Sequence, residues 1–205
     1  MAIFVTGDQH FSHKKIIEYS SRPFISIEEH DEELIASWNK AVSKNDTVYH
    51  LGDFTLGDKK KARSFFDQLN GIIKVLGNSW HHDKSWLKAE NSRSIPFHFD
   101  NSRTGGAVTI ELPIVVYEDI KIVKGQEQRL VIVMCHYPFQ EWDRGHYGSI
   151  HFHAHSHGTL PRIVNRFDVG VDNAYKLTGE YRPFELYEAA SFSQMPLLEN
   201  IVDSQ

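Results

Sequence analysis

The sequence predicts an α/β fold, with a parallel sheet and helices in the first part of the chain and a strand-rich second half. Short apolar runs alternate with helical periodicity up to about residue 80, and three of these runs end in polar residues. The second half is rich in Val and Ile and carries little helical signal. The chain has 205 residues, a length that suits one domain spanning residues 1–205.

The first half alternates strand and helix. Apolar runs followed by Gly-Asp or Gly-Asn predict three buried strands, which are Ile3–Thr6, Thr47–Leu51 and Ile72–Leu76. Helical spacing predicts three helices, which are Ser12–Tyr19, a helix that begins after Ser26, and Lys59–Leu69. Ser26 and Glu29 have the spacing of a capping box, which favours a helix start at this point. Consecutive parallel strands joined by helices follow from this order.

The second half predicts strands joined by short turns. These segments are Val108–Val116, Ile120–Val123, Leu130–Cys135 and Arg162–Val171. The residues between them include a run with a histidine at every second position, His151, His153, His155 and His157. In a strand, all four histidines would point to the same face.

Composition narrows the class of protein. Apolar residues make up 40% and charged residues 24% of the chain, as in globular domains. The net charge of −5 argues against a broad basic face that clamps nucleic acid. A single cysteine excludes an internal disulfide and a cysteine-rich zinc site. No membrane span or signal peptide is expected, so we expect a cytoplasmic protein.

Polar residues gather after the predicted strands. They are Asp8, His10, Asp53, Asn78, His136, His155 and His157. In open α/β sheets, ligands bind beyond the carboxyl ends of the strands. Mixed nitrogen and oxygen donors suit Mn, Fe, Zn, Co or Ni better than Ca or Mg. Seven residues are too many for one tetrahedral ion and match two ions that share a bridging carboxylate, an arrangement used in phosphoryl chemistry.

These residues occur in a recognisable order. The motifs are Asp8-Gln9-His10, Gly52-Asp53, Gly77-Asn78, the lone His136 and Ala154-His155-Ser156-His157. In this order, the sequence resembles the calcineurin-like metallophosphoesterase superfamily over about three quarters of the chain. The motif Arg22-Pro23-Phe24, the helix around Glu28–Asn39 and the motif Val169-Gly170-Val171-Asp172 are similar to a small single-domain bacterial and phage branch.

The resemblance implies a four-layer sandwich in which two mixed β-sheets are flanked by helices. It also implies a binuclear metal centre. Asp8, His10 and His157 would bind the first ion, Asn78, His136 and His155 the second, and Asp53 would bridge both. The implied activity is hydrolysis of a phosphoester by metal-bound hydroxide. Asn78 would also stabilise the phosphoryl oxygens. Two Mn²⁺ ions are the expected cofactors, with Fe, Zn, Ni or Co as alternatives.

The sequence departs from the family pattern at two places. Ser79 follows Asn78 where the family has a histidine that contacts the phosphate or protonates the leaving oxygen. We expect His82, paired with Asp83, to take that role, and His81 is the competing candidate. Ala154 stands where the family has glycine, which requires only a negative φ.

The loop between two of the ligand motifs suggests the substrate contacts. Trp142, Arg144 and Tyr147 lie in this loop, where aromatic rings and a guanidinium could hold a base and a phosphate. This favours a small phosphodiester such as a cyclic nucleotide, with a phosphomonoester as the alternative; ordinary loop packing explains these residues equally well. A nuclease is an alternative function, although we do not expect a nucleic-acid partner. A non-catalytic metal-binding protein with the same fold is a third reading.

The remaining histidines are expected to be structural. They are His13, His30, His50 and His98, and His50 is also a candidate partner of the site residues. His151 has about the same chance of lying near the site as away from it, and His153 less.

Overall fold

The computed structural model describes residues 1–77, 82–87, 98–101, 106–123 and 126–195. Its helices are α1 (Ile16–Tyr19), α2 (Ile27–Ala41), α3 (Lys59–Phe66), α4 (Lys84–Leu87), the short 3₁₀ turn Gly145–Tyr147, α5 (Val171–Thr178) and α6 (Leu186–Gln194). Its strands are β1 (Ile3–Thr6), β2 (Thr47–His50), β3 (Ile72–Leu76), β4 (His98–Asn101), β5 (Gly106–Glu111), β6 (Ile114–Val123), β7 (Gln126–Cys135), β8 (Ile150–His153), β9 (Arg166–Asp168) and β10 (Phe184–Glu185).

The strands form two mixed sheets. The first has the order β10-β1-β2-β3-β5-β4, in which β1, β2, β3 and β5 are parallel and the two edge strands are antiparallel. The second has the order β6-β7-β8-β9, in which β6 and β7 form an antiparallel hairpin and β7, β8 and β9 are parallel. Parallel neighbours direct their carboxyl ends to one edge, so the loops after β1 and β2 lie together, as do the loops after β7 and β8. The two sheets share a hydrophobic core, and their packing brings the two pairs of loops together.

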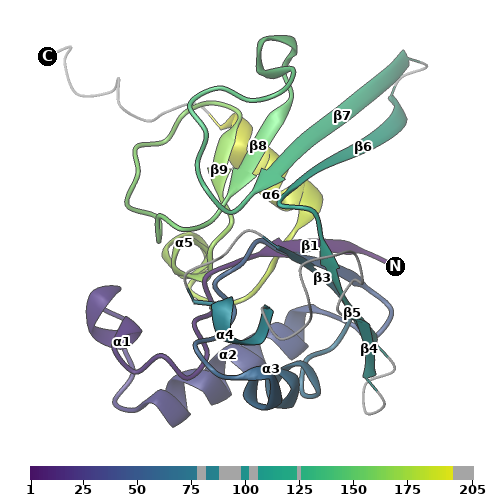
Figure 1. The fold of residues 1–205 in the computed structure, drawn as a ribbon. Helices are drawn as coiled ribbons and strands as arrows, with labels where there is room; N and C mark the ends of the chain where they lie inside the picture. Colours follow the sequence, from purple (N-terminus) through teal and green to yellow (C-terminus); the bar gives the residue numbers. More distant parts are fainter. Residues whose placement is uncertain (78–81, 88–97, 102–105, 124–125, 196–205) are drawn as a thin grey trace, which may run out of the picture.

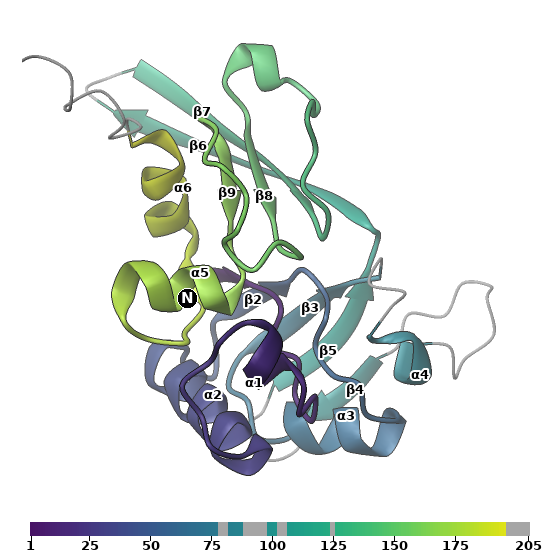
Figure 2. The same cartoon turned by 90° about the vertical axis from the view of Figure 1, so that its left-hand side faces the viewer.

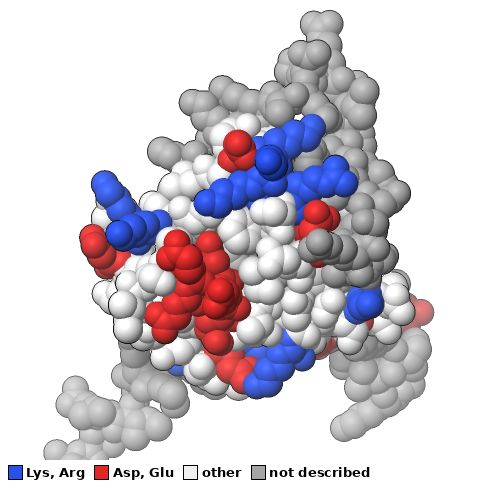
Figure 3. Space-filling model, turned by 90° about the horizontal axis from the view of Figure 1, so that it is seen from below, with Lys and Arg blue, Asp and Glu red and all other residues white. Residues whose placement is uncertain are grey.

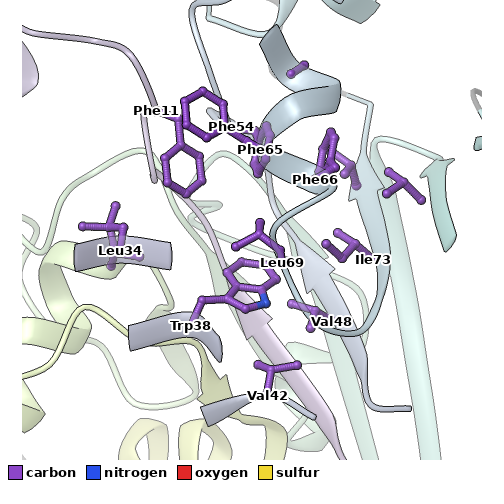
Figure 4. Close-up of a cluster of buried hydrophobic side chains, with 14 of the residues drawn as sticks. Phe11, Leu34, Trp38, Val42, Val48, Phe54, Phe65, Phe66, Leu69 and Ile73 are labelled. Atoms are coloured by element: carbon purple, nitrogen blue, oxygen red, sulfur yellow. The ribbon is translucent and has the colours of Figure 1, made fainter. Parts of the chain in front are cut away.

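Two hydrophobic cores hold the layers together. Helices α2 and α3 cover one face of the first sheet, and the second sheet lies on its other side (Figures 1 and 2). The first core joins α2 and α3 to the sheet, with Trp38, Phe66 and Ile73 among its buried side chains (Figure 4). The second core includes Val5 from β1 and Phe152 from β8, so it fills the space between the sheets. The strand alternation therefore sends successive residues of β1 into different cores.

The first three strands and the helices between them confirm the predicted order. Ser26 accepts a hydrogen bond from the Glu29 amide at 3.1 Å, as the capping spacing indicated, and α2 follows it. The first predicted helix is shorter than expected. Ser12 has a φ of 64°, which is left-handed, so the helix begins only at Ile16. The residues between β1 and α1 form a loop, and this loop carries His10 and His13.

The predicted strand Val108–Val116 is wrong, because the chain changes sheets inside it. β5 ends at Glu111 in the first sheet, and β6 begins at Ile114 in the second. Pro113 lies between them and cannot donate to a strand ladder. The predicted strand Arg162–Val171 is too long. Only β9, Arg166–Asp168, is a strand, and Val171 is the first residue of α5.

The structure confirms the broad fold class, a mixed α/β chain with two mixed sheets and helices. Among the described residues, no helix combines the length and apolar character that crossing a bilayer requires.

Candidate metal centre

The predicted ligands gather into two groups at the strand ends. Asp8, His10 and His157 offer ligand atoms that all lie within 4.8 Å of one another. Asp53, His136 and His155 form a second group that meets the same limit. Each residue comes from a loop directly after β1, β2, β7 or β8. The fold therefore assembles six side chains that are far apart in sequence.

Asp53 lies between the two groups. Its Oδ2 atom is 3.6 Å from His10 Nε2, in the first group. The same oxygen is 3.7 Å from His136 Nε2, in the second group. One carboxylate placed between two imidazoles of different groups is the geometry that a bridging ligand of two ions requires.

Asp8 and His10 fit a bound cation. Both side chains are buried, and neither carboxylate oxygen nor ring nitrogen has a hydrogen-bond partner among the described residues. Burial and the nearby carboxylates, of which Asp168 has the largest effect, raise the pKa of Asp8 well above its ordinary value. Burial lowers the pKa of His10 well below its ordinary value. Buried polar groups without partners are costly, and a divalent ion would satisfy both.

The ligand loops have a strained backbone. Left-handed φ values between 50° and 67° occur at Asp8, His10, Asp53, His155 and His157. Residues other than glycine avoid this region, and such strain concentrates at functional sites. Ala154 is not among the positive-φ residues, in agreement with expectation.

Hydrogen bonds orient the ligand histidines. His157 donates from Nδ1 to Asp172 Oδ2 at 2.5 Å, and His136 donates from Nδ1 to the Leu51 carbonyl at 3.1 Å. Both rings therefore leave Nε2 available for a metal, as metal-binding histidines commonly do. Burial lowers the pKa of His136 to about 4, so its imidazole is neutral at pH 7. Burial alone would raise the pKa of Asp172, but hydrogen bonds from His157 and Arg22 hold it below the ordinary value.

His50 is a buried histidine that bonds to two of the loops carrying candidate ligands. The sequence suggests this residue as a partner of the site residues. Its Nδ1 accepts from the Gly52 amide at 3.1 Å, and its Nε2 donates to Gln9 Oε1. It thus ties the loop before Asp53 to the loop between Asp8 and His10. Burial lowers the pKa of His50 to about 3, which keeps this ring neutral.

A cleft of about 860 Å³ is lined by four of the candidate ligands, His10, Asp53, His155 and His157. Helix α1 and the loop after β8 border it, and His13 and His82 lie in its wall. His82 Nε2 is 3.9 Å from Asp53 Oδ2, and the ring centroids of His82 and His10 are 4.6 Å apart. His82 therefore lies beside two of the candidate ligands, Asp53 and His10. Its competitor His81 lies outside the described residues, as does the predicted ligand Asn78.

His13 is a site residue that the sequence reasoning missed. Its ring centroid is 5.1 Å from that of His82 and 5.4 Å from that of His10. Burial lowers the pKa of His13 to about 4. The signal was its position three residues after His10, because the His13 amide closes a tight turn onto the His10 carbonyl at 3.0 Å.

The expected pairing of Asp83 with His82 is wrong. The Asp83 carboxylate accepts instead from the Phe54 and Thr55 amides and from the Trp86 indole, each at 2.9 Å. Burial raises the pKa of Asp83 to about 7. This side chain fixes the backbone directly after Asp53, so it supports the site without touching His82's ring.

The expected substrate contacts Trp142, Arg144 and Tyr147 do not line the cleft. Arg144 donates to Glu118 of β6, and Trp142 donates to the Ser149 carbonyl at 3.1 Å. Tyr147 is 82% exposed and borders a separate pocket with Arg144. Arg144 therefore ties the loop to β6 of the second sheet, and Trp142 closes the loop on itself.

Two other histidines of the patterned run are structural. His151 accepts from the Phe139 amide at 3.0 Å and bonds the Val133 carbonyl. His153 donates to the Ala154 carbonyl at 2.9 Å. His30 is also structural, since it is bonded to Arg22 and Asp31.

Comparisons with known proteins find two relatives in sequence and one in structure. The chain is 45% identical over 85 residues to an uncharacterised protein of Methanocaldococcus jannaschii, a match that covers 40% of this chain and 47% of that protein. The match thus spans about half the length of that relative. The chain is 25% identical over 207 residues to the gene 66 protein of Mycobacterium phage L5, covering 88% and 91% of the two chains.

A solved structure, that of a protein of unknown function from Aquifex aeolicus, is similar with a TM-score of 0.56 and 19% identity. The similarity covers 93% of this chain and 98% of that chain and concerns the fold alone. No protein-family model matches the chain.

Proposed function

We propose that this protein is a calcineurin-like metallophosphoesterase with the four-layer sandwich fold, and that it hydrolyses a phosphoester with two divalent ions. The observation that carries the proposal is the pair of ligand groups with Asp53 Oδ2 between them. The burial and missing partners of Asp8 and His10 add a physical reason for a cation at this place. Mn²⁺ is the expected ion, with Fe, Zn, Ni or Co as alternatives, because mixed imidazole and carboxylate donors suit this group of ions.

Bound there, two divalent ions would bind the phosphoryl oxygens and acidify the attacking water. Asp8, Asp53 and the histidines of the two groups would hold the ions in place. His13 and His82 lie in the cleft wall and offer ring nitrogens to the phosphoryl or leaving-group oxygen of the substrate. The cleft is open to solvent on this side, so a small phosphorylated substrate reaches the centre directly. His13 and His82 are therefore the proposed substrate contacts, and an ion held by His10, His13 and His82 is the alternative use of these rings.

The structure changes the argument about substrate class. The preference for a base-bearing diester depended on Trp142 and Tyr147, which lie outside the cleft. The proposal is therefore phosphoester hydrolysis, with diester and monoester distinguished by experiment.

A nuclease is disfavoured. On the face seen from below, an acidic patch lies beside a row of basic side chains, so the charge there is mixed (Figure 3). The net charge is −5. Neutralising a nucleic-acid backbone over many phosphates requires a broad basic surface. Salt-dependent binding to single-stranded DNA would contradict this reasoning.

The test is a comparison of initial rates on bis(p-nitrophenyl) phosphate and p-nitrophenyl phosphate with added Mn²⁺. Asp53→Asn is the blank, and Asp143→Asn, an exposed carboxylate outside the cleft, is the matched control. We expect turnover of at least one ester by the wild type and the control, and none by Asp53→Asn with its fold intact. Equal rates for Asp53→Asn and the wild type would refute the mechanism. Tight Mn²⁺ binding without hydrolysis of any ester would favour a non-catalytic metal-binding protein.

A further inference from the structure

Arg22 is a buried arginine that holds the backbone beneath the first ligand group. Its side chain is fully enclosed, and the residue is 4% exposed. Nη2 donates to the Asp8 carbonyl at 2.7 Å, and Nη1 donates to the Gln9 carbonyl at 2.9 Å. Asp8 has a left-handed φ of 62°. Arg22 therefore stabilises the strained turn that presents the Asp8 carboxylate.

The same guanidinium forms a two-pronged ion pair with Asp172. Nε and Nη2 donate to its two carboxylate oxygens at 2.8 and 2.7 Å. The oxygen that receives Nη2 also accepts the Nδ1 proton of His157 at 2.5 Å. A carboxylate behind an imidazole fixes the ring's orientation and keeps the proton on Nδ1. Arg22 is thus linked to two of the three ligands in the first group.

Helix α2 completes this network. His30 Nε2 accepts from Arg22 Nη1 at 2.6 Å, and His30 Nδ1 donates to Asp31 at 2.8 Å. Asp31 in turn accepts from the Ser12 amide at 3.0 Å, in the loop that carries His10 and His13. The network therefore begins and ends on the loop after β1.

We infer that Arg22 and Asp172 are positioning residues for the first metal position, formed by Asp8, His10 and His157. This inference rests on the proposed function, because it concerns the same metal centre. The second position has separate support, since His136 is oriented by the Leu51 carbonyl. A guanidinium suits the role because its planar fork makes several directed hydrogen bonds at once, which a lysine ammonium does not reproduce.

The test measures equilibrium binding of Mn²⁺, which does not depend on turnover. The variants are Asp172→Asn and Arg22→Lys. Asp46→Asn is the matched control, since Asp46 is also buried and accepts from two backbone amides, but at the other end of β2. We expect two ions in the wild type and the control. In both variants, one ion should bind roughly 10–100-fold more weakly, while the other is unchanged.

A second measurement separates positioning from plain stability. Nitrogen-15 correlation spectra of the metal-free protein report which nitrogen of His157 carries the proton. We expect the Nδ1–H form in the wild type and a mixture in Asp172→Asn. A purely structural ion pair would lower the unfolding free energy of the variants without changing the His157 tautomer or the Mn²⁺ affinities.

Wild-type Mn²⁺ binding in Arg22→Lys would overturn the inference, whether or not Asp172→Asn folds. Equal weakening of both ions would also overturn it. Two bound ions without hydrolysis of any ester would refute the proposed function and leave this inference standing. Hydrolysis by the wild type with unchanged Mn²⁺ binding in the variants would support the proposed function and overturn this inference.

Discussion

Gly170 gives a sharp test of the first metal position. Its φ is −62°, which alanine adopts without strain. A Gly170→Ala substitution therefore acts through the steric contacts of the new Cβ atom and not through the backbone. A Cβ atom at this position would lie 2.7 Å from Asp8 Oδ2 and 2.9 Å from Asp168 Oδ1. The first distance is about 0.7 Å shorter than the 3.4 Å at which ordinary contact begins. In Gly170→Ala, the Asp8 carboxylate must therefore move by several tenths of an ångström.

Metal–ligand distances tolerate shifts of only about 0.2 Å. We therefore expect Gly170→Ala to weaken one Mn²⁺ ion roughly 10–100-fold, equivalent to about 1.4–2.8 kcal/mol. The metal-free protein should lose about 1–3 kcal/mol through overpacking. Gly145→Ala is the control, because its Cβ would meet Trp142 at 3.3 Å outside the cleft. The assay combines a Mn²⁺ binding isotherm with urea unfolding in chelator. Two ions bound with wild-type constants in Gly170→Ala would refute the placement of Asp8 as a ligand.

Three further predictions concern the site and the core. Burial raises the pKa of Asp8, so the metal-free wild type loses stability as pH rises from about 4 toward that raised pKa. Asp8→Asn should remove this loss and be the more stable metal-free protein at pH 8 in urea unfolding; a less stable variant would contradict it. The variants His82→Ala and His13→Ala should each have a lower kcat, by about 100-fold or more for His82→Ala, and both should still bind two Mn²⁺ ions. The control His146→Ala, which changes an exposed residue outside the cleft, should match the wild type in both measurements. Phe66→Ala should cost about 3–5 kcal/mol in urea unfolding, because this fully buried ring is central to the first core; a loss below 1 kcal/mol would contradict it.

The sequence determined the backbone positions of the site. Apolar runs that end in polar residues located the ends of β1, β2 and β7, and the predicted parallel order placed the ends of β1 and β2 together. Asp8 and Asp53 meet for this reason, whereas His136 and His157 reach them only through the packing of the second sheet on the first. No such run predicted β8, which only the alternating histidines marked. Such patterns are local, since each strand is defined by a few consecutive residues and its side-chain alternation.

The tertiary structure decided which polar side chains face the cleft. The sequence predicts a structural role for His13 and an even chance that His151 lies near the site. In the structure His13 lies beside His82, while His151 is bonded to Val133 and Phe139. Likewise, the role of Arg22 appears only when Asp172, 150 residues away, folds against it. The orientation of a buried polar side chain depends on its hydrogen-bond partners, and these partners come from segments that are distant in sequence. Local periodicity therefore determines which strand, helix or strand end a residue belongs to. Long-range hydrogen bonding and burial determine which groups its side chain contacts.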